Sequence, residues 1–117
     1  MTEAVNAKET LAFLVAVKEP DEFTCIAVDD HYIEATGASE ELMINRPLED
    51  IFPPLEMKYL KKEYGRAIAA RKPYTYRTRT SLKGNTVYLK TTLVPVFGEN
   101  QACTHLIGLS EVEENSD

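Results

Sequence analysis

Apolar positions recur along this chain with two periods, one typical of strands and the other typical of helices. Near the start, two short apolar runs, Leu11 to Lys18 and Phe23 to Val28, predict the two strands of a hairpin. Pro20 and Asp21 lie between them and suit the centre of a type I turn. Residues 2–10 are polar and favour helix, so we expect a short leading helix before the hairpin.

Short helices are predicted after the hairpin. Asp29 can cap a helix from Asp30 to Thr36, and Gly37 can end it because glycine readily adopts the left-handed conformation of a C-cap. Ser39 is a candidate cap for a second short helix. The segment LEDIF can form one further helical turn before two prolines stop it.

One apolar stripe marks the longest predicted helix, which extends from about Leu55 to Arg71 and cannot continue through Pro73. The residues that recur at three- and four-residue spacing in this stripe are Met57, Leu60, Tyr64, Ala67 and Ile68. We expect the helix to cover a sheet with Leu60, Tyr64 and Ile68 turned inward.

The last third of the chain alternates with the period of two that is typical of strands. Three strands are predicted, Tyr74 to Ser81, Thr86 to Val96 and Cys103 to Val112, and Gly84 with Asn85 would form the first turn. The residues expected on the face beneath the long helix are Tyr76, Thr78, Thr80, Leu89, Thr91 and Leu93. Arg77 and Arg79 would lie on the opposite face. This order of elements predicts an α+β domain whose antiparallel sheet is covered on one face.

Composition agrees with one small globular domain. The chain has 117 residues, of which 44% are hydrophobic and 27% charged. The longest apolar run, Leu11 to Val17, is too short to span a membrane, and the first residues lack a signal-peptide pattern, so we expect a cytoplasmic protein. A complete small protein and an excised domain of a larger receptor would both have this sequence pattern.

Charge is distributed unevenly along the chain. Ten basic residues and one acidic residue lie between Met57 and Lys90, whereas the remainder holds three basic and eighteen acidic residues. Such a division is typical either of a surface for an anionic partner or of two solvated faces of one domain. The second interpretation is favoured, and nucleic acid is not an expected partner.

Three segments resemble the PAS family of sensory and signalling domains. FTCIAVDDHYIEATGASEEL is similar to that family's strand-to-helix signature, with Asp29 where asparagine is common, Tyr32 at the aromatic position, and Thr36 and Gly37 matching directly. LKGNTVYLKTTLVPVF resembles the turn and long strand of the family, and HLIGLSEVEE resembles its closing strand. Asn45 stands where the family usually has a turn glycine.

The resemblance implies a single PAS-like domain over residues 1–117, with a core from about residue 11 to 114. It implies a five-stranded antiparallel sheet of order 2-1-5-4-3 with the helices packed on one face. In this family a ligand, when present, sits between the long helix and the sheet, and the signal passes through terminal helices or a dimer interface.

The sequence carries no cofactor motif of the kinds that the resemblance implies. Haem-binding relatives supply a histidine from the long helix, but the only histidines here are His31 and His105. Flavin-adduct light sensors need a reactive cysteine on a helix, and Cys25 and Cys103 both fall in predicted strands. No metal-ligand spacing or nucleophile–base pair is present. We therefore expect no haem, flavin or metal, and at most a small reversible ligand.

The residues expected to line a ligand pocket lie on the inner sides of the long helix and of the sheet. They are Leu60, Tyr64, Ile68, Tyr76, Thr78, Leu89, Thr91 and Leu93. Their hydroxyl groups would give a mainly apolar cavity a few polar contacts. The alternative is that the aromatic side chains fill the core and leave no cavity.

Three functional hypotheses follow. The first is a sensory module that binds a small molecule and couples it to a partner or a dimer interface. The second is a ligand-free module for dimerisation or protein interaction. The third, an enzyme, would require a buried acid or histidine in the pocket, and the sequence points to none, so we expect the chain not to be an enzyme. A homodimer formed through the N-terminal segment and the outer sheet face is the expected assembly, because the first strand is apolar on both faces.

Overall fold

The computed structural model describes residues 10–18, 21–82 and 85–113. The structure contains the five strands that the hydrophobic periods predict, a sixth strand of two residues, and a set of mostly short helices. The elements are β1 (Thr10–Lys18), β2 (Glu22–Val28), α1 (Asp30–Thr36), α2 (Glu40–Met43), β3 (Arg46–Pro47), a 3-10 turn (Leu48–Asp50), α3 (Pro54–Ala70), β4 (Tyr74–Leu82), β5 (Asn85–Phe97) and β6 (Cys103–Glu113). The expected leading helix lies outside the described residues.

The strands form one antiparallel sheet in the order β3-β2-β1-β6-β5-β4. The order 2-1-5-4-3 expected for five strands is therefore confirmed, because β6 inserts between β1 and β5. The two-residue strand β3 is additional and pairs with β2 at the edge of the sheet. Asn45 brings the chain to this edge by adopting a φ of 64° and donating its N–H to the carbonyl of Cys25 at 2.7 Å.

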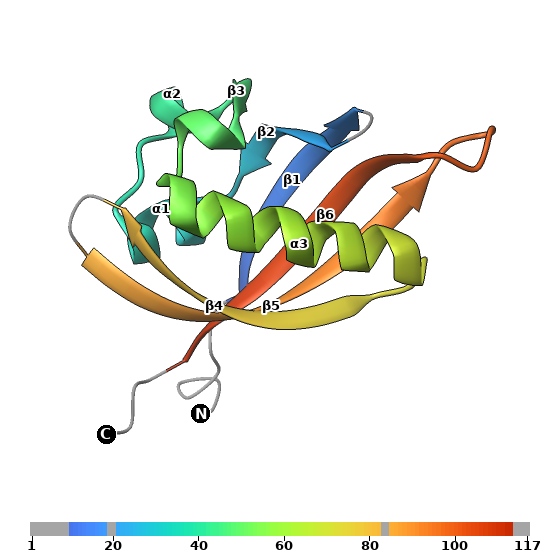
Figure 1. Cartoon of the computed structure of the whole chain (residues 1–117). Helices are drawn as coiled ribbons and strands as arrows, with labels where there is room; N and C mark the ends of the chain where they lie inside the picture. The colour runs from blue at the N-terminus through green and yellow to red at the C-terminus, as the bar shows by residue number, and fades with distance from the viewer. Residues whose placement is uncertain (1–9, 19–20, 83–84, 114–117) are drawn as a thin grey trace, which may run out of the picture.

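The helices cover one face of the sheet, and α3 crosses it as the longest of them (Figure 1). Leu60 and Tyr64 of α3 are buried, as are Leu89, Thr91 and Leu93 on the sheet beneath. The apolar stripe of the sequence is thus the face of α3 that contacts the core. Burial of such side chains supplies the main stabilisation of a small domain.

Several element boundaries differ from the sequence-based prediction, among them both ends of α3 and the start of β5. The helix α3 begins at Pro54, which is tolerated in a first turn, and ends before Arg71, whose φ of 57° makes it a left-handed C-cap. Asn85 belongs to β5, where it pairs with Leu82, and so is not part of the turn. Gly84, the other predicted turn residue, lies outside the described residues.

The predicted caps of α1 are confirmed. Asp29 Oδ1 accepts a hydrogen bond from the backbone N–H of Tyr32 at 2.9 Å. Gly37 has a φ of 75° and donates its N–H to the carbonyl of Ile33. The helix also places Tyr32 in the core, so its start is important for the packing above the sheet.

Replacing Asp29 with alanine should lower the free energy of unfolding by about 0.5–2 kcal/mol, because a backbone N–H loses its side-chain acceptor. Asp30→Ala is the matched control, since Asp30 is exposed in the first turn and makes no cap. Urea denaturation of both variants measures the difference. If both variants lost the same free energy of unfolding, the hydrogen bond from Tyr32 to Asp29 would contribute nothing to stability.

Candidate functional site

A small cavity lies between α3 and the sheet and has a volume of about 20 Å³. Such a volume holds about one water molecule. Its lining comes from the helices α1 and α3, from the segment that follows the 3-10 turn, and from the strands β1, β4, β5 and β6. The lining residues are Phe13, Tyr32, Phe52, Leu60, Tyr64, Tyr76, Thr78, Thr80, Leu89, Thr91 and Ser110.

Six of the eight pocket residues proposed from the sequence line this cavity, and Ile68 and Leu93 do not. Ile68 is half-buried one turn beyond Tyr64, against the edge of the core. Leu93 is fully buried but pairs with Tyr74, which contacts the second half of α3. The stripe on α3 is longer than the cavity, so its far end packs against other residues.

Five lining residues were not among the expected pocket residues, although Thr80 was expected on the face beneath the long helix. They are Phe13, Tyr32, Phe52, Thr80 and Ser110. The alternation of β6, in which Leu106 and Ser110 are both buried, could have identified Ser110. Tyr32 was recognised only as the aromatic residue of a signature. Phe52 follows the 3-10 turn in an irregular segment, and no periodicity indicates that it points inward.

The polar groups at the cavity are neutral hydroxyls. Thr91 Oγ1 and Ser110 Oγ share a hydrogen bond at 2.7 Å. Burial raises the pKa of Tyr32, Tyr64 and Tyr76 well above that of an exposed tyrosine, so all three remain protonated at neutral pH. The lining residues include no carboxylate, histidine or cysteine. The cavity can therefore donate and accept hydrogen bonds, but its walls supply no ionised group.

One carboxylate is buried in the core where the sequence indicated none. Glu63, on α3, is 5% exposed and accepts hydrogen bonds from Tyr74 Oη at 2.6 Å and from Arg66 Nη1 at 3.2 Å. These two partners satisfy the buried charge. Glu63 does not line the cavity, so it gives the site no acid or base.

Aromatic side chains close the space above the sheet. Tyr64 packs edge-to-face against Phe23, with ring centroids 5.1 Å apart, and against Tyr76 at 6.3 Å. Cys25 is buried nearby, and burial raises the pKa of its thiol to about 11, which makes it a poor nucleophile. These aromatic rings and the buried thiol are therefore suited to packing the core rather than to nucleophilic catalysis.

The opposite face of the sheet exposes apolar residues, which we call the outer face. Val96, Ile107 and Leu109 are 36%, 37% and 41% exposed. Leu14 and Val94 extend the patch, because both pair with Ile107 across neighbouring strands. A shallow apolar groove of about 370 Å³ adjoins Leu14 and Ile107.

Charged residues border this apolar centre. Arg77 of β4 and Glu113 of β6 form an ion pair at 3.1 Å. Lys90 of β5 pairs in register with Glu111 of β6. The outer face thus combines an apolar centre with a charged margin of both signs.

Comparison with known proteins bears first on the fold. The Rhodobacter sphaeroides LOV protein shares 14% identity at a TM-score of 0.72, and the match covers 93% of this chain but only 62% of that protein. A PAS domain from Colwellia psychrerythraea shares 18% identity at a TM-score of 0.68, with 87% and 86% covered. No curated protein sequence matches significantly. No helix within the described residues is long and apolar enough to cross a membrane.

A third similar structure contradicts our expectation that the domain has no cofactor. It is a light-oxygen-voltage domain studied with a flavin analogue, 10% identical at a TM-score of 0.70, with 92% of this chain and 79% of that one covered. A fold of this kind can therefore be associated with a flavin, and missing motifs were insufficient grounds for the expectation. The interior described here is nevertheless too small for a flavin ring system, which would require Tyr64 and Tyr76 to move.

Family membership follows from the sequence as well as from the fold. The sequence profile of the PAS fold matches residues 25–110, which is more than half of the chain. The matched region includes the capped helix α1, the long helix α3 and most of the sheet. The chain belongs to the PAS fold family.

Proposed function

We propose that this domain acts in signal transduction by pairing with a second copy of itself through the outer face. The observation that carries this proposal is the apolar centre of the outer face, in which Val96, Ile107 and Leu109 are exposed. The half-buried Leu14 and Val94 adjoin Ile107. The helices of the fold cover only the other face of the sheet (Figure 1), and Ile107 and Leu109 remain 37% and 41% exposed on the outer face.

The composition of the outer face supports a protein partner. Protein interfaces commonly have an apolar centre that loses its water and a polar margin that stays wet. Here the margin carries both charge signs, with Lys90 and Arg77 close to Glu111 and Glu113. Two copies related by a two-fold axis present identical patches to each other, and a patch with both signs can complement itself. Dimerisation through the outer face does not require a ligand between α3 and the sheet, and it does not prevent one from binding there.

Sedimentation of the wild-type chain at rising concentration should show a reversible dimer. Leu109→Lys should weaken dimerisation by about tenfold or more, because a charge would replace an apolar side chain at the centre of the contact. Leu42→Lys is the matched control: it makes the same substitution at an exposed leucine of α2, on the helical side of the sheet, and should leave the dimer intact. A strict monomer at high micromolar concentration would exclude the proposal.

A second candidate function is the binding of a small molecule between α3 and the sheet. The observation in its favour is the group of hydroxyls around the cavity, above all the buried pair Thr91 and Ser110. The proposed contact residues are the six expected residues that line the cavity, which are Leu60, Tyr64, Tyr76, Thr78, Leu89 and Thr91. A ligand larger than water would have to separate α3 from the sheet. A native mass spectrum and an absorption spectrum of freshly purified protein would detect such a ligand, including a coloured cofactor.

A further inference from the structure

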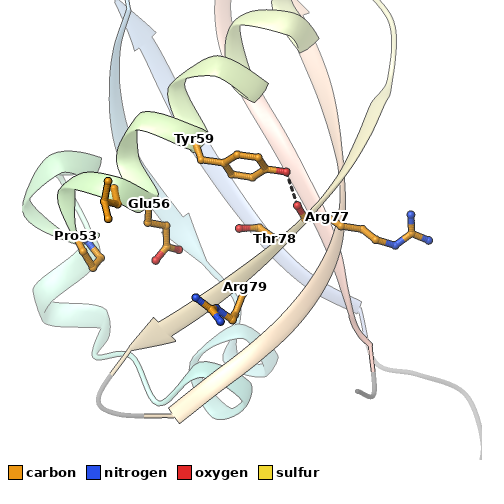
Figure 2. A pocket seen from close by; sticks show the side chains of 7 residues that line it. Pro53, Glu56, Tyr59, Arg77, Thr78 and Arg79 are labelled. Atoms are coloured by element: carbon orange, nitrogen blue, oxygen red, sulfur yellow. Dashed lines mark hydrogen bonds between the residues drawn. The ribbon is translucent and has the colours of Figure 1, made fainter. Parts of the chain in front are cut away.

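An open cleft of about 500 Å³ lies on the surface (Figure 2); it shares Thr78 with the lining of the interior cavity and Arg77 with the margin of the outer face. It separates the first half of α3 from the edge strand β4. Its walls combine apolar, aromatic and charged side chains, and its lining residues are Pro53, Leu55, Glu56, Tyr59, Arg77, Thr78 and Arg79. A volume of this size is within the range of about 300–1,000 Å³ that is common for small-molecule sites.

Two hydrogen bonds hold the walls of the cleft together. Tyr59 Oη donates to the backbone carbonyl of Arg77 at 2.5 Å. Thr80 Oγ1 donates to Glu56 Oε2 at 2.7 Å. The aromatic ring of Tyr59 and the carboxylate of Glu56 are therefore positioned before any ligand arrives, which lowers the entropic cost of binding.

The cleft contains one anionic and one cationic group. The carboxylate of Glu56 is directed toward β4, and the guanidinium of Arg79 lies on the same side of that strand (Figure 2). Partial burial raises the pKa of Glu56, whereas its bond from Thr80 and the charge of Arg79 lower it. A ligand group that donates a hydrogen bond to the Glu56 carboxylate would therefore replace hydrogen bonds to water that the carboxylate loses through burial.

Arg77 differs from Arg79 although both lie on β4. Its side chain points away from the cleft (Figure 2), and it donates to Glu113 at 3.1 Å. It contributes its backbone carbonyl to the cleft through the bond to Tyr59. The hydrogen bond to Glu113 is made by Arg77, whereas the charge of Arg79 acts to lower the pKa of Glu56.

Exposed apolar surface lies beside these charges. Leu55 is 85% exposed and Tyr59 is 39% exposed, which are high values for large apolar side chains. Pro53 is exposed next to them. A ligand with an apolar part would remove this surface from water, and the hydrophobic effect would contribute to its binding.

We propose that this cleft binds a free apolar α-amino acid in its zwitterionic form. The ammonium group of the ligand donates to the carboxylate of Glu56. The carboxylate of the ligand accepts from the guanidinium of Arg79, and the apolar side chain of the ligand packs on Tyr59 and Leu55. Only a ligand with both charges next to one another and an apolar part satisfies all three features. None of the side chains proposed to contact the ligand belongs to the outer face, so the dimer can be tested separately.

The experiment is a titration of the protein with leucine and with phenylalanine, followed by isothermal calorimetry and by backbone NMR shifts. We expect a dissociation constant on the order of 1 mM, as is usual for so small a ligand in an open site. Isoamylamine, which lacks the carboxylate, and 4-methylpentanoate, which lacks the ammonium, should each bind at least about tenfold more weakly, because one charge-assisted contact is lost.

Single substitutions test whether the charges of Glu56 and Arg79 contribute to binding beyond any general effect of a substitution on the protein. Glu56→Gln and Arg79→Gln should each weaken leucine binding by about tenfold or more. Lys72→Gln is the control: it removes an exposed cation that does not line the cleft, and it should bind leucine as the wild type does. Arg79 is exposed, so its variant should fold normally even if Glu56→Gln loosens the bond to Thr80.

Three results would overturn the proposal: no binding of either amino acid by the wild type, equal binding of the amine alone, or equal weakening by Lys72→Gln. The dimer is tested separately, because Leu109→Lys should bind leucine unchanged. If that variant is monomeric and still binds, both proposals hold. If the wild type is a monomer that binds, only the dimer is wrong.

Discussion

Replacing Leu60 with alanine should lower the free energy of unfolding by about 2–5 kcal/mol, the usual range for removing a large side chain from a core. Leu60 is 4% exposed, lies on the inner face of α3 and lines the interior cavity together with Leu89. Its loss would both remove apolar contacts and enlarge a cavity that the fold keeps small. Urea denaturation with linear extrapolation measures the change.

Leu55→Ala is the matched control, because it makes the same substitution on the same helix at a residue that is 85% exposed. We expect it to change the stability by no more than about 0.5 kcal/mol. If both variants lost the same amount, the helix would not be packed through the face described here. Both curves should keep the slope of the wild type, since neither variant alters the surface exposed on unfolding greatly.

Replacing Gly108 with alanine should also destabilise the domain, by about 1–3 kcal/mol, because the new methyl group has no room. A Cβ on Gly108 would lie 2.0 Å from Cζ of Phe13 and within 2.4 Å of two further ring atoms. Gly108 and Phe13 are direct partners in the pairing of β6 with β1. The ring of Phe13 also packs edge-to-face on Tyr32, so it can move only by disturbing α1.

Two further variants check the cause of this effect. In a Phe13→Ala background, Gly108→Ala should cost much less, and a double-mutant cycle would report the difference as coupling. Gly65→Ala should have the opposite sign and stabilise the domain by about 0.5–1 kcal/mol, because Gly65 lies within α3 with nothing near its missing Cβ. A destabilised Gly65→Ala, or additive losses in the cycle, would contradict the packing described here.

The long helix and the main strands could be predicted from the sequence because their signals are local. A period of 3.6 residues placed Leu60 and Tyr64 on one side of α3. A period of two placed Thr91 and Leu93 on one face of β5. Likewise, Asp29 and Gly37 act on the few residues next to them, and the caps of α1 were predicted correctly.

The candidate site could be predicted only in part. Residues on regular elements, such as Tyr76 and Leu89, were expected at the cavity and line it. Phe52 was missed because it sits in an irregular segment, and β3 was missed because two residues are too few to show a period. Glu63 was not expected to be buried, since its partner Tyr74 lies eleven residues away and the sequence does not reveal that contact.

The sequence by itself determined which residues form helices and strands, which sides of them are apolar, and the resemblance to the PAS fold. Only the tertiary structure decided that the aromatic rings of Tyr64 and Tyr76 nearly fill the interior, and that Glu56 meets Thr80 beside an open cleft. The physical reason is the separation along the chain between the residues that interact. Periodicity and caps depend on neighbours within about one helical turn, whereas a cavity volume depends on side chains from distant segments packing together in three dimensions.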